Sequence, residues 1–400
     1  MVVVLGVSET GLSAMRLLGR RGVRCWGIDA SFDHPGFSSR YCERRICVSE
    51  SVSAPELAAV LSEIARTRED RPVLLPTSDR FVRLLSELRS GLADRFQVAL
   101  PPSDVVADML DKERFSACAE RAGLRSPRTA PVSEAGGLEE AARKVGFPAI
   151  VKPRASDRRP AGLPKARVLR DEAELRAFEE DHRGAIGADL VVQEYIPGGD
   201  LQHLSVAVAL DSHARPVASF VARKRRQGNR GAGVGTFVES HRDDEAASVA
   251  RRFLSRIGYV GVAEMELKRH GTTGELFAIE VNPRLWSQVM LPAALGLDFP
   301  LLAYRIARGA ALSDEVPSPR GDVAWQDLIG DWYWTFCSEG YFWRGDVSAS
   351  RWLMETLSCC AHPFFEWRDP MPAMKRLWQE ASGMAAKAAT REAHGGARHA

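Results

Sequence analysis

Apolar runs and amphipathic stretches alternate along the first hundred residues. The run VVVLG is continuously apolar, which is typical of a strand buried on both faces, and SETGLSAMRLLGRRG follows it with Leu12, Met15 and Leu18 on one helical face. The segments VRCWGID, PELAAVLSEIARTR, PVLLPTSD and RFVRLLSELRSGL continue this order. The alternation predicts a small open parallel sheet with covering helices. Gly6 and Gly11 after the first strand do not form G-x-G-x-x-G, so we expect no dinucleotide site there.

The pattern changes to shorter, mostly antiparallel strands further along the chain. Residues 101–190 combine a helix pair, the short strand GFPAIVKP, an amphipathic helix and the strand DLVVQEY. Residues 191–300 predict antiparallel strands with one helix at DEAASVARRFLSRIG, and GVAEMELKRHGTTGELFAIEVNPR predicts two strands joined by a polar turn. We therefore expect a mixed α+β region after the parallel sheet.

Tryptophan is concentrated near the C-terminus, where seven of the nine lie after residue 320. Core packing is the default interpretation of such a concentration. Two functional alternatives are a cap that shapes a substrate pocket and a homodimer surface, because aromatic residues are enriched at the centres of interfaces. The Ala- and Gly-rich end ASGMAAKAATREAHGGARHA predicts a fraying helix and a disordered tail.

Length and charge narrow the class of protein. The 400 residues suffice for two or three domains, and a net charge of +2 gives no reason to expect nucleic acid or an anionic membrane as a partner. No uninterrupted apolar run is long enough to span a bilayer, and the N-terminus lacks the basic region of a signal peptide. Seven cysteines, an odd count without a C-x-x-C pair, predict reduced thiols in a cytoplasmic protein.

Acidic and amide side chains gather in the predicted hairpin GVAEMELKRHGTTGELFAIEVNPR. Period two places Glu264 and Glu266 on one face of its first strand, and Glu280 and Asn282 on one face of its second strand. If the two faces coincide, three or four oxygen ligands converge, and buried carboxylates need a cation or a proton as compensation. Glu266, Glu280 and Asn282 are ligands of the kind that Mg²⁺ prefers. The alternative is an exposed hairpin with solvated acids.

Basic and polar groups elsewhere are placed to contact a nucleotide. Arg284 follows the hairpin and could hold a phosphoryl oxygen with both arms of its guanidinium group. Lys112 opens a helix in LDKERF, and Lys152 ends the strand FPAIVK, from which a lysine can reach a phosphate. For both lysines, simple solvation is the alternative.

The strand end VVQEYIPGGD offers an edge for a nucleobase. The backbone of Glu194, Tyr195 and Ile196 could hydrogen-bond an adenine edge, and Asp200 or His203 could take ribose hydroxyls. The alternative is an ordinary strand end followed by a Pro-Gly turn.

The order Lys112, Lys152, QEYIPGGD, EMELK, AIEVNPR resembles the ATP-grasp superfamily. More narrowly, it is similar to the carboxylate–amine ligase branch and to the related carbamoyl-phosphate-synthetase-like ATP-binding domains. The resemblance covers about residues 1–305, and E-x-N-P-R with the preceding M-E-L strand is its most specific part.

The resemblance implies an α/β and α+β protein with the ATP-grasp fold. A Rossmann-like domain would span residues 1–103, and an ATP-grasp domain would span residues 104–310, with a small α+β central subdomain at about 120–193. A Trp-rich extension with its disordered tail would occupy residues 311–400.

The resemblance also implies roles for the matching residues, with ATP and Mg²⁺ as cofactors. The implied nucleotide contacts are Lys112 and Lys152 for phosphates and adenine, Glu194 and Ile196 for the adenine edge, Ile279 for the adenine floor, and Asp200 for the ribose. The implied Mg²⁺ ligands are Glu266, Glu280 and Asn282, and Arg284 would steady the transferred phosphate and the acyl phosphate.

The implied reaction activates a carboxylate as an acyl phosphate, with release of ADP, and an amine then displaces phosphate to form an amide or peptide bond. The substrates would be a small carboxylate and an amine, an amino acid or peptide above all, in natural-product or dipeptide biosynthesis. Two alternatives are a bicarbonate-activating carboxylase or carbamoyl-phosphate-type enzyme, and a non-catalytic nucleotide-binding protein.

Two segments bear on catalysis. Arg223 and Lys224 in RKRRQGNRGAGVG end a strand before a Gly-hinged loop, which could close over ATP and an anionic acceptor; a solvated charge run is the alternative. The segment PRASDRRPAGLPKARVL departs from the small Gly/Ser-rich flap of the family, because it carries extra basic residues and prolines. Positive charge there could replace backbone donors to the phosphates.

Overall fold

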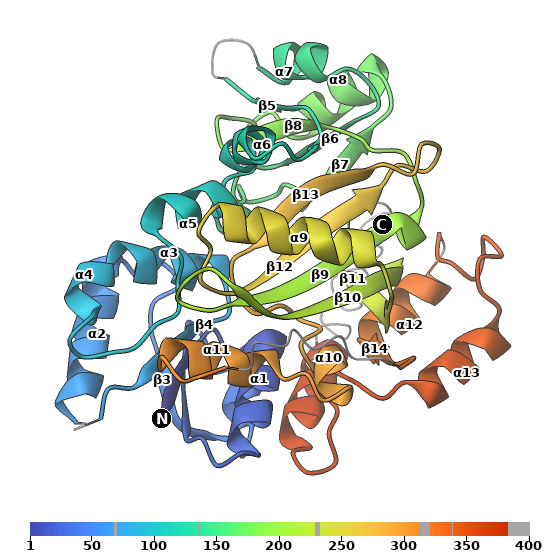
Figure 1. Cartoon of the computed structure of the whole chain (residues 1–400). Helices are drawn as coiled ribbons and strands as arrows, with labels where there is room; N and C mark the ends of the chain where they lie inside the picture. Colours follow the sequence, from blue (N-terminus) through green and yellow to red (C-terminus); the bar gives the residue numbers. More distant parts are fainter. Residues whose placement is uncertain (68–69, 134–136, 229–232, 313–320, 338, 383–400) are drawn as a thin grey trace, which may run out of the picture.

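The computed structural model describes residues 1–67, 70–133, 137–228, 233–312, 321–337 and 339–382. Within these ranges the strands form three sheets, of four, six and four strands (Figure 1). The predicted disordered tail falls almost entirely in residues 383–400, outside the described residues. Among the helices that are described, none combines the length and the apolar character needed to cross a membrane.

A parallel sheet in the order β3-β2-β1-β4 forms the N-terminal region, as the alternating pattern predicts (Figure 1). The apolar run becomes β1 (Val2–Leu5), which is wholly buried because it lies between β2 and β4. The other elements are β2 (Cys25–Asp29), β3 (Cys42–Cys47), β4 (Val73–Pro76), α1 (Glu9–Gly19), η1 (Pro35–Ser38), α2 (Ala54–Arg66), α3 (Asp79–Glu87) and α4 (Arg89–Leu92).

A small antiparallel sheet in the order β5-β8-β6-β7 lies above the rest of the molecule in Figure 1. Helices α5 (Ser103–Leu110) and α6 (Lys112–Arg121) lead to it, and the side chain of Asp111 caps the first turn of α6. The elements of this part are β5 (Thr129–Pro131), α7 (Gly137–Val145), β6 (Ala149–Pro153), η2 (Ser156–Arg158), β7 (Arg167–Leu169), α8 (Glu172–Asp181) and β8 (Leu190–Glu194).

A six-stranded antiparallel sheet in the order β13-β12-β9-β10-β11-β14 forms the largest layer. Helix α9 packs across β9 and β10 (Figure 1). The elements are η3 (Asp200–Gln202), β9 (His203–Leu210), β10 (Pro216–Gln227), β11 (Gly235–Ser240), α9 (Asp244–Arg256), β12 (Gly261–Arg269), β13 (Leu276–Asn282), α10 (Met290–Ala294), α11 (Phe299–Ala307), β14 (Ala324–Gln326), α12 (Leu328–Phe336) and α13 (Ala349–Ser358).

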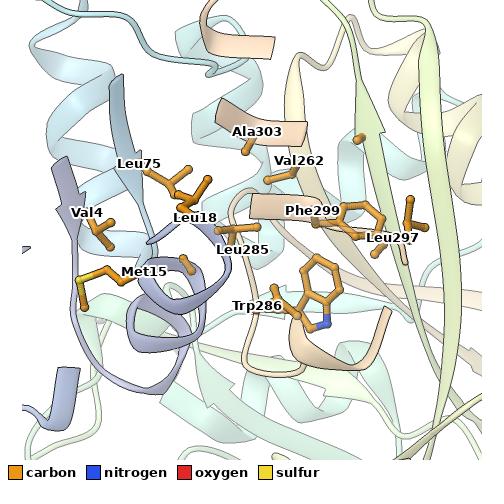
Figure 2. Packing of buried hydrophobic residues seen from close by; sticks show 14 of the residues in the cluster. Val4, Met15, Leu18, Leu75, Val262, Leu285, Trp286, Leu297, Phe299 and Ala303 are labelled. Atoms are coloured by element: carbon orange, nitrogen blue, oxygen red, sulfur yellow. The ribbon is translucent and has the colours of Figure 1, made fainter. Parts of the chain in front are cut away.

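One hydrophobic cluster joins the parallel sheet to the large sheet (Figure 2). Met15 and Leu75 from the N-terminal region lie in the same cluster as Leu285, Trp286 and Phe299, which follow β13. All five are buried, and Trp286 packs edge-on against Phe299 with ring centroids 5.1 Å apart. This packing fixes the segment after β13 against the parallel sheet.

The C-terminal segment, residues 321–382 as described, is tied to both regions by buried ion pairs. Arg16 of α1 is fully buried and donates to Asp369 at 2.9 Å, while Arg226 of β10 donates to Asp331 of α12 at 2.8 Å. Strand β14 also adds to the large sheet beside β11. The predicted domain boundaries stay predictions, but residues on both sides of the boundary at 310/311 share one sheet.

Candidate active site

A cavity of about 380 Å³ lies between the small sheet and the large sheet, a volume in the range of small-ligand sites. Strands β6 and β8 line one side, and β9, β10, β12 and β13 line the other. Its basic side chains are Lys112, Lys152, Arg159, Lys165, Lys224 and Lys268, and its acidic side chains are Asp157, Glu194, Glu266 and Glu280. The excess of basic groups favours an anionic ligand.

The pairing of β12 with β13 brings four polar side chains together. Glu264 lies opposite Asn282, and Glu266 lies opposite Glu280. Residues two apart on a strand share a face, and directly opposed residues are neighbours on it. The amide nitrogen Nδ2 of Asn282 donates to Oε2 of Glu264 at 2.8 Å. The register therefore puts the three predicted Mg²⁺ ligands and Glu264 on one patch of adjacent strands.

Lysines neutralise two of these carboxylates. Nζ of Lys224 donates to Oε2 of Glu266 at 2.9 Å, and Nζ of Lys112 lies 3.6 Å from Oε2 of Glu280. Burial acts to raise the pKa of Glu280, but Lys112 and Lys152 more than offset it and lower that pKa to about 2. Burial likewise acts to lower the pKa of Lys224, while Glu266 raises it above its usual value. Both carboxylates thus line the cavity, each with the ammonium group of a lysine beside it.

Glu264 is the acid that sequence reasoning did not include among the ligands. It is buried, and it accepts hydrogen bonds from Ser205 and Asn282. Burial raises its pKa to about 7, and the neighbouring Glu266 adds to this. Within the described ranges it has no ion pair, so a divalent cation beside it would supply the missing positive charge. Period two had already placed Glu264 on the correct face.

The donor set fits Mg²⁺ only together with a ligand that brings oxygen atoms. In the part of the chain that is described, no three His, Cys, Asp or Glu side chains gather closely enough to hold a metal ion alone. Mg²⁺ keeps several waters and is commonly held by one or two carboxylates plus substrate phosphates. Glu280 and Asn282, with Glu264 or Glu266, meet that requirement.

Two lysines of the cavity titrate close to neutral pH. Burial lowers the pKa of Lys152 and that of Lys268 to about 8. Nζ of Lys152 donates to Oε1 of Gln193 at 2.8 Å. Nζ of Lys268 lies 4.5 Å from the centroid of the Tyr195 ring, and no ion pair of Lys268 occurs among the residues described. Each lysine is poised to gain an anionic partner.

The predicted hinge is placed at one end of the cavity. Glu194 and Ile196 line the cavity, as does Ile279. Tyr195 does not line it, and its backbone nitrogen donates to the oxygen of Pro148 at 3.1 Å. His203 lines the cavity, is 8% exposed, and has no hydrogen-bond partner on either ring nitrogen within the described structure.

Five predicted site residues do not line the cavity: Tyr195, Asp200, Arg223, Asn282 and Arg284. Arg284 donates from Nε to Asp79 at 2.6 Å and from Nη2 to Oδ1 of Asn282 at 3.1 Å, so it adjoins the carboxylate patch from the side of α3. Arg223 donates to Glu239 on β11 at 3.0 Å and does not line the cavity, so we assign it no catalytic role. Its neighbour Lys224 points into the cavity because successive residues of a strand face opposite sides.

Asp200 does not line the cavity either. Its oxygens accept from Nε2 of Gln227 at 2.7 Å and from the hydroxyl of Tyr341. Both oxygens thus have partners within the protein, and the ribose contact of Asp200 stays a prediction. Residues 229–232 of the predicted Gly-hinged loop lie outside the described residues.

Several cavity residues were missed by sequence reasoning. Lys268 lies two positions after Glu266 and Ile150 two positions before Lys152, so period two could have identified both. Gln193 and Gln227 also line the cavity, and only the folded arrangement reveals them.

The atypical flap closes one side of the cavity. Ser156, Asp157, Arg159 and Lys165 line the cavity. Asp157 accepts two hydrogen bonds from Arg83 of α3, at 2.8 and 3.0 Å. The flap is therefore fastened to the N-terminal region while it presents two basic side chains to the cavity.

Residues 111–315 match the model of a protein family described as the carbamoyl-phosphate synthase L chain, ATP binding domain. The D-alanine–D-alanine ligase of Xanthomonas axonopodis pv. citri is 29% identical over 233 residues, which cover 54% of this chain and 70% of that enzyme. The N5-carboxyaminoimidazole ribonucleotide synthase of Synechococcus elongatus is 29% identical over 187 residues, which cover 46% of this chain and only 45% of that enzyme.

A solved structure shares the arrangement of the sheets. The biotin carboxylase domain of the 2-oxoglutarate carboxylase of Hydrogenobacter thermophilus, determined with MgADP and bicarbonate, has a TM-score of 0.64 at 18% identity. The alignment covers 80% of this chain and 73% of that domain. At this identity the likeness establishes the fold.

Proposed function

The chain belongs to the family of carbamoyl-phosphate synthase L chain ATP-binding domains, and on this premise we propose that it is an ATP- and Mg²⁺-dependent ligase that activates a carboxylate and joins it to an amine. Its fold is the ATP-grasp fold, so the prediction of fold class is confirmed. The proposal is carried by one observation: a lysine-rich cavity meets a patch of buried and half-buried carboxylates on two adjacent strands.

The lysines support binding of a triphosphate at the carboxylate end of the cavity. Lys112 and Lys224 already contact Glu280 and Glu266, so phosphates next to those acids would lie within their reach. Lys152 lies half-buried in the cavity wall, and the flap adds Lys165 to the same wall. Charge-assisted hydrogen bonds to phosphate oxygens are stronger than neutral ones.

Mg²⁺ would be held by Glu280 and Asn282, together with Glu264 or Glu266. When bound, it neutralises charge on the β- and γ-phosphates. The protein's own contribution is to place these side chains next to one another, which the register of β12 and β13 achieves.

The other end of the cavity suits a nucleobase. Ile150, Ile196 and Ile279 contribute apolar surface beside the Glu194–Ile196 hinge. His203 adds a buried imidazole whose ring nitrogens have no partner in the described structure. An apolar slot with a few polar groups is the usual form of a small-molecule site.

The carboxylate substrate would lie between the patch and the N-terminal sheet. Arg284 is fixed there by Asp79, the first residue of α3, which follows the carboxyl end of β4. Ligands of open α/β sheets bind outside the carboxyl ends of the strands. A carboxylate oxygen would attack the γ-phosphorus, ADP would leave, and an amine would displace phosphate from the acyl phosphate. Arg284 would stabilise charge on the transferred group.

We propose amino acids or small peptides as the substrate class. The support is the similarity to D-alanine–D-alanine ligase, of which the chain covers 70%. The pathway, natural-product or dipeptide biosynthesis, is part of the same proposal.

The test uses the purified full chain with ATP, MgCl₂ and a panel of amino acids, singly and in pairs. We expect ADP and phosphate release that depends on an amine, with mass spectrometry showing a product formed by loss of water from two substrates. Release that depends on bicarbonate alone would favour a carboxylase. Binding of MgATP without any turnover would favour a non-catalytic protein.

A matched pair of variants separates the site from general damage. Glu280→Gln removes a carboxylate of the patch, whereas Glu63→Gln removes an exposed one of α2. The proposal expects turnover to be lost in the first and kept in the second. Equal turnover in both would overturn the assignment of the carboxylate patch.

A further inference from the structure

The C-terminal segment reaches the nucleotide end of the cavity through one buried phenol. The hydroxyl of Tyr341 accepts from the backbone nitrogen of Gln227 at 2.9 Å and donates to a carboxylate oxygen of Asp200. Tyr341 is 4% exposed, and it lies outside residues 111–315, which match the family. No property of the family therefore assigns it a role.

Of the two residues that Tyr341 holds, Gln227 lines the cavity and Asp200 lies just behind it in the chain segment that leads to His203. Gln227 is fully buried. Its Nε2 donates to the other oxygen of Asp200 at 2.7 Å, and its Oε1 accepts from the backbone nitrogen of Gly233 at 3.3 Å. Asp200 begins η3, which leads directly to the cavity residue His203. One hydroxyl thus couples the turn before β9 to the end of β10.

Neighbouring contacts give this hydroxyl a fixed position. Asp331 of α12 is fully buried and accepts from Arg226, the residue before Gln227, as well as from Thr236 at 2.9 Å. Trp334 of α12 packs so closely on Gly228 that a Cβ there would lie 2.7 Å from Nε1 of its indole. The C-terminal segment therefore contacts the end of β10 on both sides of Gln227, at Arg226 and at Gly228.

We propose that Tyr341 is a positioning residue of the nucleotide site, which orients Gln227 and, through Asp200, the turn that presents His203. The inference rests on the proposed function, because the ligand in question is the nucleoside part of ATP. It also assigns the C-terminal segment a part in nucleotide binding. Asp200 acts through its partners and does not itself touch the nucleotide.

The test compares Tyr341→Phe with Tyr333→Phe, a control on α12 whose side chain is 55% exposed. The probes are MgADP and magnesium tripolyphosphate, measured by calorimetry. Tripolyphosphate reports only the phosphate end of the cavity. We expect Tyr341→Phe to raise the Kd for MgADP about tenfold, because the variant loses one hydrogen bond to a charged group. The Kd for tripolyphosphate should stay unchanged.

The outcomes separate this inference from the proposed function. If the wild-type chain binds neither probe, the proposed function fails. If it binds both, and Tyr341→Phe binds MgADP as tightly as Tyr333→Phe does, the positioning role is refuted. An equal loss for both probes, accompanied by a lower Tm, would show general loosening and also refute it. Should Tyr341→Phe not fold, Asp200→Asn decides by the same selective loss.

Discussion

The nucleotide affinity of this protein should depend on pH through two lysines of the cavity, Lys152 and Lys268. Burial lowers the pKa of Lys152 and that of Lys268 to about 8, and both line the cavity. A bound phosphate would stabilise the protonated form of each of these lysines that it contacts. The perturbation is therefore a rise in pH from 7 to 9, in the wild-type chain and in Lys152→Arg, Lys268→Arg and the double variant.

The size of the effect follows from these pKa values. A group with a pKa of about 8 is ~90% protonated at pH 7 and ~10% protonated at pH 9, so its cationic fraction falls about tenfold. If only the cationic form binds the ligand, the Kd for MgADP rises about tenfold for each lysine that contacts it. If both lysines contact the ligand, the Kd would rise about a hundredfold, which corresponds to a loss of ~2.7 kcal/mol in the free energy of binding. The phosphates themselves stay ionised over this range, because their second pKa is ~6.

Calorimetric titration with MgADP at fixed ionic strength measures this dependence. Arginine stays protonated throughout, since its pKa is above ~12. We expect Lys152→Arg to remove one tenfold step, and the double variant to bind with a Kd that is constant from pH 7 to pH 9. A wild-type Kd that does not change with pH, or an unaltered slope in the double variant, would refute the reasoning.

Three further predictions concern the carboxylate patch and the C-terminal segment. Removal of a group that only supports a metal ligand typically lowers activity by ~10–100-fold, and Glu280→Gln should lower turnover by more than this. The variant should also lose the gain in ADP affinity that Mg²⁺ gives; an unchanged gain would contradict the role of Glu280 as a metal ligand. Glu264→Gln should raise the Mg²⁺ concentration for half-maximal turnover more than Glu266→Gln does, and the reverse order would favour Glu266 as the ligand. Asp331→Ala leaves Arg226 buried without its main partner, so the free energy of unfolding should fall by about 3–5 kcal/mol, measured by urea unfolding followed by tryptophan fluorescence; a loss below ~1 kcal/mol would contradict this.

Local periodicity accounts for the parts of the fold and site that the sequence could predict. The continuous apolar run at β1 and the alternation after it gave the parallel sheet, because a strand buried on both faces has a recognisable pattern. Period two in the hairpin placed Glu264 with Glu266, and Glu280 with Asn282, on one face of each strand, and the register of the structure then joined the two faces in one patch.

Partners that are distant in sequence account for the parts that could not be predicted. Arg223 and Lys224 are equally basic neighbours, but only the second faces the cavity, because Glu239 on the adjacent strand takes the first. Asp200 is the predicted ribose-binding acid, and it accepts a hydrogen bond from Tyr341, which lies 141 residues further along the chain. A single sequence without the fold contains no signal for such pairings.

The ion pairs of the cavity determine the order in which its ligands can bind. Glu266 is held by Lys224 and Glu280 by Lys112, so a lone Mg²⁺ ion would have to displace ammonium groups that already neutralise these acids. A triphosphate offers the same lysines new anionic partners and releases the carboxylates to the metal. Binding of nucleotide therefore strengthens binding of Mg²⁺, and thermodynamic linkage requires Mg²⁺ to strengthen binding of nucleotide by the same factor. Lys112 and Lys224 compete with a lone Mg²⁺ ion for the carboxylates, and the same two lysines therefore couple the binding of Mg²⁺ to the binding of nucleotide.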